Sequence, residues 1–277
     1  MIYDNLIIQP EIWKKLKKYS ITKKLPNAFL FHGNNGSGKE GHAIEFASLI
    51  NCLNKENNES CLKCSSCKKI SHLQHGNLKI IHPLPRGKVT KTFDSPFDSM
   101  TKAEIEDYKL ILEQKSKNPY YKIDIPKSNS ILINSIRYLK KELSLSSIEK
   151  GWNIILILDA EKLCYPNNTS ANALLKILEE PPEKTLFILI TSNYSKIINT
   201  IKSRCQELYF PPLTYKQIYN SLSEITSEVD KSIIAAISNG HLQMAKILEN
   251  DLNKVYANLK LFINACYNFK SKYDNLI

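Results

Sequence analysis

Short apolar runs alternate with amphipathic stretches along the first three quarters of the chain. Five runs have the length of buried or half-buried strands: 28–31, 78–81, 154–158, 186–190 and 207–210,. Between them, apolar residues recur at helical spacing in four stretches: 9–24, 43–50, 131–145 and 170–178,. Strands that alternate with helices in this way predict an α/β domain built on a parallel sheet.

Two regions depart from this alternation. Residues 83–129 are polar and contain five of the twelve prolines, which predicts an irregular insertion on the surface. After the Pro211-Pro212 pair the only pattern is helical, in four stretches: 215–224, 230–239, 241–249 and 252–270. We therefore expect a small helical domain to follow the α/β domain.

Composition adds limits rather than a function. The 277 residues carry a formal charge of +11, which favours an acidic partner such as nucleic acid about as much as a lysine-rich surface that keeps the protein soluble. The longest apolar runs fall far short of the roughly 20 residues of a membrane helix, and the N-terminus lacks the features of a signal peptide. We expect a cytoplasmic protein with no membrane partner.

A glycine-rich segment follows the first predicted strand. Residues Gly33-Asn34-Asn35-Gly36-Ser37-Gly38-Lys39 match the pattern G-x-x-x-x-G-K between a strand and a helix, the setting of a phosphate-binding loop. In such a loop, backbone N–H groups and a helix N-terminus face the phosphates and the lysine neutralises charge. The candidate nucleotide-binding residues are Gly33, Gly36, Ser37, Gly38 and Lys39.

Two positions argue against ATP hydrolysis at this loop. Glu40 stands where a Ser or Thr hydroxyl binds the magnesium ion, and its carboxylate repels phosphates,. Asp159, at the end of the 154–158 strand, is the candidate magnesium-binding acid, although it also fits a simple strand cap. Ala160 follows it where hydrolysing enzymes often have a Glu, and Glu161 comes one place late. We expect weak or absent ATP binding and no catalysis.

Four cysteines form the second motif. Cys52, Cys61, Cys64 and Cys67 have a spacing suited to one tetrahedral, structural zinc ion with no open position,. Free structural cysteines and a redox dithiol are the alternatives. His72 and His75 are able to replace a Cys ligand, but histidines beside such a loop are more often surface residues.

Further residues complete a resemblance to a known family. The resemblance rests on the phosphate loop, the four cysteines and three segments: 170–182, which ends in Leu-Glu-Glu-Pro-Pro, 185–191 and 201–205. With these residues the chain resembles AAA+ clamp-loader subunits, most closely the delta-prime group of bacterial DNA polymerase III. The resemblance implies three parts. These are a P-loop AAA+ domain at 1–210 with a zinc module at 52–67 and an insertion at 83–129, a helical lid domain at 211–251, and the start of a reduced or truncated helical collar at 252–277.

The resemblance also implies a role for Arg204. In this family the Arg of the Ser-Arg-Cys motif, here Ser203-Arg204-Cys205, reaches the ATP of a neighbouring subunit, whereas a lone Arg is usually a solvated surface charge. Glu40, Ala160 and Gln243, which replaces an Arg of the motor subunits' lid, mark losses at the chain's own site.

The expected function is that of a noncatalytic subunit that works with motor and delta-type subunits to open a sliding clamp and load it on primed DNA. An active clamp-loader ATPase and a zinc-dependent nucleic-acid-binding protein without a motor partner are the alternatives.

Overall fold

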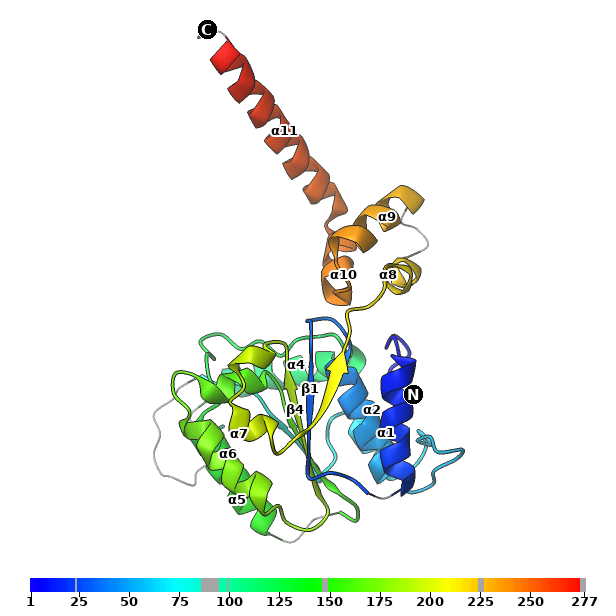
Figure 1. The fold of residues 1–277 in the computed structure, drawn as a ribbon, viewed down its shortest axis with the longest axis vertical. Coiled ribbons are helices and arrows are strands. Elements are labelled where there is room, and N and C mark those ends of the chain that lie inside the picture. Colours follow the sequence, from blue (N-terminus) through cyan, green and yellow to red (C-terminus); the bar gives the residue numbers. More distant parts are fainter. Residues whose placement is uncertain (23, 86–94, 99, 146–148, 224–226, 275–277) are drawn as a thin grey trace. The chain divides into compact units, whose positions relative to one another are not determined.

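A computed structural model gives the fold of the chain (Figure 1). It describes residues 1–22, 24–85, 95–98, 100–145, 149–223 and 227–274, with side chains up to residue 266. Inter-residue contacts divide the chain into two compact units, Met1–Pro211 and Pro212–Ile277.

The first unit contains the predicted parallel sheet. Its strands lie in the order β2-β3-β4-β1-β5 and all neighbours pair in parallel. The strands are β1 (Ala28–Gly33), β2 (Leu78–Ile81), β3 (Asn153–Ile157), β4 (Thr185–Thr191) and β5 (Gln206–Phe210). All five predicted strands are confirmed, because each combines an apolar run with turn-forming residues at its ends. Their carboxyl ends meet at one edge of the sheet, where the sequence placed the phosphate loop and Asp159.

Helices cover both faces of this sheet (Figure 1). One face carries α1 (Pro10–Thr22) and α2 (Lys39–Asn51), and the other carries α5 (Ile133–Ser144), α6 (Thr169–Glu179) and the short α7 (Asn199–Lys202). Phe29 of β1 contacts Phe46 of α2, with ring centroids 5.9 Å apart. The next residue, Leu30, belongs to the fully buried cluster that includes residues of α5 and α6. Side chains of β1 therefore alternate between two apolar layers.

The remaining elements of this unit lie around the edges. The helix α3 (Ser65–Ser71) follows the cysteine loop and packs on α2. Two 3₁₀ turns, η1 (Ala160–Cys164) and η2 (Tyr194–Lys196), follow β3 and β4. Among the described residues, no helix has an apolar stretch long enough to cross a bilayer.

The insertion is more ordered than its composition predicts. The structure contains α4 (Lys102–Lys117), a helix of 16 residues that begins with a capping box between Thr101 and Glu104,. Tyr120, Ile123 and Ile125 behind it are buried. The expectation of irregular structure is therefore wrong for 102–117, and the expectation of a surface position is wrong for Tyr120, Ile123 and Ile125. Sequence reasoning missed this helix, although Ile105, Tyr108 and Leu112 have helical spacing and are half-buried; the residue it buries most deeply is Lys115. Residues 86–94 and 99 of the insertion lie outside the described part.

The second unit is helical among its described residues. It consists of α8 (Tyr215–Ser221), α9 (Glu228–Ile237), α10 (Leu242–Asn250) and α11 (Leu252–Asp274). Ile218, Ile234 and Leu242 are buried in its small core. Gly240 has a positive φ of 78°, and a Cβ there would stand 2.6 Å from the carbonyl oxygen of Leu213. Only glycine fits where the chain turns into α10.

Candidate nucleotide site, cysteine module and Arg204

The phosphate loop has the backbone that its glycines predict. Gly33 ends β1 so close to β5 that a Cβ would stand 2.1 Å from the carbonyl oxygen of Phe210. Gly36 and Gly38 have φ values of 71° and 84°, in the left-handed region,. Gly38 is the N-cap of α2, so the loop delivers the chain directly into a helix N-terminus.

Lys39 lies within the loop that it follows. Its Nζ donates to the carbonyl oxygens of Gly33 (2.8 Å) and Asn34 (2.6 Å), and the residue is 6% exposed. Burial lowers the pKa of Lys39 to about 8, although the neighbouring carboxylates of Glu40, Glu161 and Asp159 oppose the shift. The loop thus carries a cation at neutral pH, held by its own carbonyl groups.

Glu40 is turned toward the insertion. Its Oε2 forms an ion pair with Nζ of Lys115, whose side chain is 1% exposed. The same ammonium donates to the carbonyl oxygens of Pro119 and Tyr121, at 2.8 Å each. All three N–H bonds of Lys115 therefore have acceptors. Sequence reasoning missed Lys115, because nothing local marks a lysine in a polar helix as buried.

The acid at the end of β3 also meets lysines. Oδ2 of Asp159 lies 3.5 Å from Nζ of Lys122 and 3.3 Å from Nζ of Lys162. The next residue, Ala160, is fully buried. Glu161 accepts a 2.6 Å hydrogen bond from the hydroxyl of Thr191 at the end of β4. The structure brings Asp159 to the phosphate loop as predicted, and a second carboxylate does not directly follow it.

The segment before α1 holds the loop from outside. The side-chain amide of Gln9 donates to the carbonyl oxygens of Ser37 (2.9 Å) and Pro211 (3.0 Å), and its backbone N–H donates to Nε2 of His42 (3.1 Å). Nδ1 of His42 therefore carries the proton and donates to the carbonyl oxygen of Gly38, 2.8 Å away. Burial lowers the pKa of His42 to about 4. No sequence signal marked Gln9 or His42.

The close approach of this segment and of the insertion depends on a fourth glycine. A Cβ on Gly41 would stand 2.7 Å from a methyl carbon of Leu6 and 2.7 Å from Cβ of Pro119. Gly41 lies outside the phosphate-loop pattern, but it explains why glycines are concentrated here. Its absent side chain lets both segments pack on the first turn of α2.

The four predicted cysteines converge. The Sγ atoms of Cys52, Cys61, Cys64 and Cys67 all lie within 4.8 Å of one another. Tetrahedral zinc with Zn–S distances of about 2.3 Å places sulfurs about 3.8 Å apart, so a small contraction would complete the site. Cys52 ends α2, Cys64 is the N-cap of α3 and Cys67 lies in its first turn. The four thiols fit one zinc ion that leaves no position open for catalysis.

Hydrogen bonds prepare these sulfurs for a cation. Backbone N–H groups of Cys61, Cys64 and Cys67 donate to the Sγ of the preceding cysteine of the set, at 3.3–3.5 Å. Desolvation opposes ionisation of Cys64, but N–H donors outweigh it and lower its pKa to about 6, whereas burial raises the pKa of Cys67 to about 12. Bound zinc deprotonates cysteine thiols outright.

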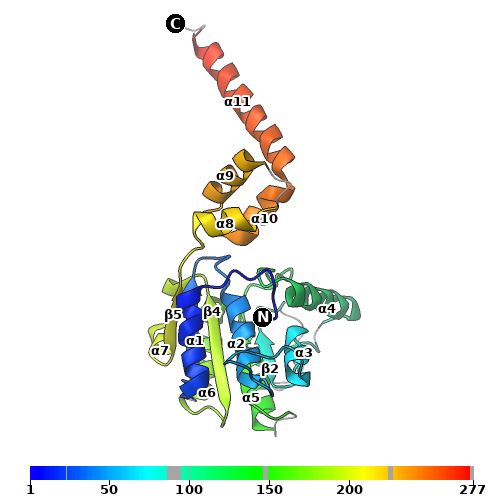
Figure 2. The same ribbon diagram turned by 90° about the vertical axis from the view of Figure 1, so that its right-hand side faces the viewer.

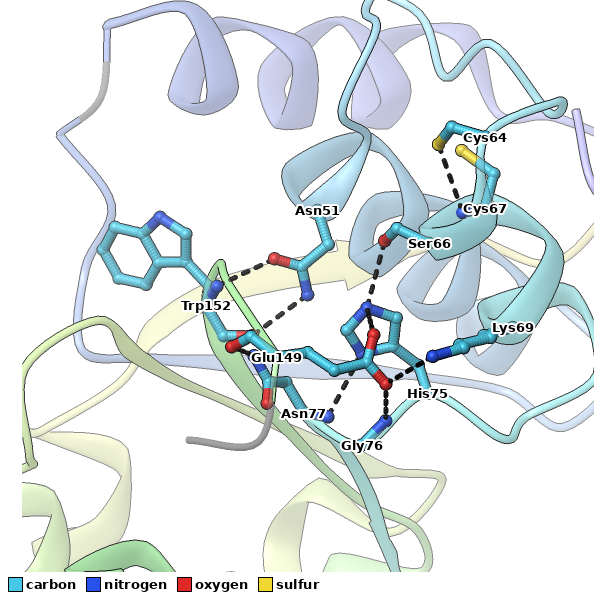
Figure 3. A network of polar contacts seen from close by, with 10 residues as sticks. All are labelled: Asn51, Cys64, Ser66, Cys67, Lys69, His75, Gly76, Asn77, Glu149 and Trp152. Carbon is cyan, nitrogen blue, oxygen red and sulfur yellow. Dashed lines mark hydrogen bonds and ion pairs between the residues drawn. The ribbon is translucent and has the colours of Figure 1, made fainter. Parts of the chain in front are cut away.

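His75 is not a surface residue, contrary to expectation. It is 3% exposed and anchors a polar network between the cysteine module and the sheet (Figure 3). Its Nδ1 accepts from the N–H of Asn77 (3.1 Å), so Nε2–H faces the hydroxyl of Ser66 (3.1 Å) and Oε2 of Glu149 (3.3 Å). Burial lowers the pKa of His75. His72, in contrast, is exposed as expected.

Asn51 extends this network to β3. Its side-chain amide exchanges two hydrogen bonds with the backbone of Trp152, at 2.8 and 3.0 Å (Figure 3). Glu149 meanwhile accepts from Lys69 of α3 (3.0 Å) and from the N–H of Gly76 (3.1 Å). The cysteine module is therefore fastened to the segments that lead into β2 and β3.

Arg204 lies in the turn between α7 and β5. Its Nη1 donates to the carbonyl oxygen of Thr200 (2.9 Å), and its Nη2 donates to Oε1 of Glu179 (2.5 Å) at the end of α6. The side chain is 35% exposed. Two helices thus orient a guanidinium that remains accessible.

Comparison with known proteins decides the family. A family model described as DNA polymerase III, delta subunit, matches residues 8–214. The chain belongs to this family. From Bacillus subtilis, DNA polymerase III subunit delta' is 27% identical over 90% of this chain and 61% of its own length. Subunit tau of the same organism is 27% identical over 88% of this chain and 36% of its own length. The chain therefore spans only part of each relative.

A solved structure supports the fold alone. A RuvB variant from Thermotoga maritima superposes with a TM-score of 0.50 at 12% identity, covering 92% of this chain and 65% of that protein. Together with the family match, the parallel sheet and the helical second unit, this confirms the predicted class, an AAA+ P-loop domain followed by a small helical domain. The chain is thus a clamp-loader family member with a cysteine cluster suited to a metal ion.

Proposed function

We propose that the chain is a noncatalytic, delta-prime-type subunit of a replicative DNA polymerase clamp loader. It would help ATP-hydrolysing motor subunits to open a sliding clamp and place it on primed DNA. The observation that carries the proposal is the contrast between its two ATP-related features. The chain's own site has Glu40 paired with Lys115 and the apolar Ala160 after Asp159, whereas Arg204 is intact, oriented and accessible.

Arg204 is proposed to act in trans as an arginine finger. During phosphoryl transfer, negative charge spreads over phosphoryl oxygens, and a guanidinium stabilises it with paired hydrogen bonds. Thr200 and Glu179 occupy one N–H on each of two nitrogens, which leaves three of the five donors of an arginine for a phosphate. Arginine fingers change hydrolysis rates by about 10³ to 10⁵ in well-studied enzymes. Lysine would replace Arg204 poorly, since it offers a point charge rather than a fork.

The remaining parts are assigned on the same basis. We propose residues 211–251 as the lid, in which Gln243 of α10 replaces the arginine of motor subunits. The region 252–277 would begin the collar through which the subunits assemble. Its helix α11 exposes large apolar side chains, among them Leu261 and Phe262, which are 67% and 68% exposed. Such side chains need a partner surface.

An active clamp-loader ATPase is the second candidate, because the chain has the same sequence identity, 27%, to the tau subunit as to delta'. ATP turnover by the purified chain separates the two. The proposed function expects no turnover above background, and turnover that disappears in a Lys39→Ala variant would establish the ATPase instead.

Assembly tests the proposal against a zinc-dependent nucleic-acid-binding protein without a motor partner. The chain is mixed with motor and delta-type subunits of the same organism, and the masses of native complexes are measured. A complex that contains all three subunit types is expected. A chain that stays alone while the other subunits assemble would contradict the proposal.

A further inference from the structure

The insertion brings two lysines to the two carboxylates Glu40 and Asp159 of the nucleotide site. We name residues 102–125 the insertion arm. Lys115 of the arm pairs with Glu40, at the position after the phosphate loop, and Lys122 of the arm pairs with Asp159 at the end of β3. Figure 2 shows α4, the helical part of the arm, beside α3 at the β2 edge of the sheet. A segment outside the loop pattern thus controls the charge of the site.

The two lysines differ in what they are able to do. The side chain of Lys115 is 1% exposed and all its donors are occupied, so it only cancels the charge of Glu40. The side chain of Lys122 is 46% exposed and its single described partner atom lies 3.5 Å away. Lys122 is therefore able to turn toward a ligand without leaving a buried group unpaired.

The contacts of Asp159 disfavour a divalent cation. Magnesium is usually held in such sites by one or two carboxylates together with the phosphates. Here one carboxylate oxygen, Oδ2 of Asp159, already faces the ammonium groups of Lys122 and Lys162. A metal ion bound to Asp159 would be repelled by both at a distance of a few ångströms.

The net charge shows what the lysines replace. The charged groups linked around the loop include one more lysine than carboxylate: Lys39, Lys115, Lys122 and Lys162 against Glu40, Asp159 and Glu161. A phosphate site with one lysine, two carboxylates and a divalent ion has the same excess of one positive charge. The lysines of the arm therefore give this site the positive charge that a metal-dependent phosphate site obtains from its divalent ion.

Lys122 also acts on the lysine of the phosphate loop. Burial is the main reason why the pKa of Lys39 is lowered, and the charge of Lys122 adds to the shift in the same direction. An anion between the two ammonium groups would oppose this shift. The phosphate loop adds the backbone N–H groups of a glycine-rich turn,.

We propose that this site binds the polyphosphate of a nucleotide without a divalent cation, with Lys122 in place of the metal. The proposal goes beyond the proposed function and does not depend on Arg204 or on assembly. It agrees with a site that hydrolyses nothing, because no metal and no second carboxylate next to Asp159 are available to activate water.

The test measures ATP binding to the full-length, zinc-loaded chain by equilibrium dialysis, in buffer freed of divalent ions by a resin and in the same buffer with Mg²⁺. A resin is preferable to a soluble chelator, which would strip zinc from the cysteines. The wild-type chain should bind ATP in both buffers with affinities that agree within about threefold. Lys122→Ala should weaken binding about tenfold or more in metal-free buffer, and Mg²⁺ should restore part of the loss.

Lys117→Ala is the matched control. It removes the same charge from the exposed side of the arm, where Lys117 pairs only with Glu113 among the described residues. Because Lys122 is exposed, its variant should fold, and a thermal melt checks this. Binding that requires Mg²⁺ in the wild type, binding that is absent in both buffers, or equal affinities of the Lys122 and Lys117 variants would each overturn the proposal.

Discussion

Helix α2 joins two sites that are built in different ways. At its C-terminal end, the four thiols of the cysteine module come from one short stretch of chain and are oriented by each other's backbone N–H groups. At its N-terminal end, the phosphate loop meets Asp159 from β3, Gln9 from the N-terminal segment and two lysines from the insertion arm. One site is local, and the other is assembled from distant parts of the sequence.

This difference between a local site and a composite site explains why the cysteine module and the nucleotide site respond differently to changes in the sequence. A local metal site of like ligands keeps its geometry as long as its own few residues persist. A composite site changes when any contributing segment changes, and here the insertion arm has redirected the charges of Glu40 and Asp159. The cysteine module has all four of its ligands together, whereas the nucleotide site has Glu40 and Ala160 where a hydroxyl and a second carboxylate were expected.

The largest expected effect is at the local site. Replacing one ligand, Cys64→Ser, should abolish stoichiometric zinc binding, because one of the four thiolates is lost. The effect on the module should be large, because structural zinc contributes on the order of 10 kcal/mol to small metal-dependent folds. Amide hydrogen exchange should rise sharply across 52–67, while the strands keep their protection, since the sheet has its own apolar core. Metal analysis and exchange measured on the same samples check this.

Cys266→Ser is the control for this substitution, because Cys266 is exposed and lies outside the module. It should retain about one zinc per chain. A wild-type protein that contains no metal yet is fully protected across 52–67 would contradict the zinc assignment.

The next effect concerns the attachment of the insertion arm. Glu40→Gln would leave the ammonium of Lys115 buried without its counter-charge, which should cost about 3 kcal/mol, the low end for a broken buried pair. The double variant with Lys115→Met should recover part of this loss. Glu113→Gln, which breaks an exposed pair on the same helix, should cost much less, because exposed ion pairs contribute little to stability. Urea unfolding gives all these values, and equal costs for the two single variants would show that the arm is not anchored by this pair.

A smaller effect should appear as pH dependence. His42 binds a proton near pH 6.5 when unfolded but only near pH 4 when folded. The unfolded state therefore takes up more protons as the pH falls, and the contribution of His42 to stability, complete above about pH 6.5, is lost between there and about pH 4. His42→Gln should reduce the slope of unfolding free energy in this window by up to about 1.4 kcal/mol per pH unit.

Tryptophan fluorescence is a suitable signal for this measurement. Both tryptophans, Trp13 and Trp152, belong to the first unit, so the signal reports on the unit that contains His42. The pH dependence of the cysteine module is common to the wild type and the variant and cancels in the difference. Identical slopes for the two proteins would show that burial does not hold His42 neutral.

The sequence was sufficient for whatever depends on local pattern. The strands were predictable because their apolar runs are short and bounded by turns, and the cysteines because four like ligands rarely cluster by chance. The positive φ values of Gly36 and Gly38 follow from the loop pattern itself. The position of Asp159 beside the loop followed from the rule that parallel strands end at one edge of a sheet.

Contacts between distant residues were not predictable in this way. Lys115 and Glu40 are 75 positions apart, and nothing in the sequence of α4 marks a lysine as its most deeply buried residue. His75 was expected on the surface, because a histidine gives no sign in the sequence that Ser66 and Glu149 will satisfy it in the interior. Buried polar networks depend on partners that only the folded chain brings together.

ATP hydrolysis by the assembled clamp loader, measured with Arg204→Ala and Lys39→Ala variants of this chain, tests the central claim most directly. The account predicts that Lys39→Ala leaves turnover unchanged, because this chain's own loop hydrolyses nothing. Arg204→Ala should remove the part of the total ATP turnover that comes from the neighbouring subunit's site, while folding and assembly stay intact. Unchanged turnover with Arg204→Ala and reduced turnover with Lys39→Ala would contradict the account.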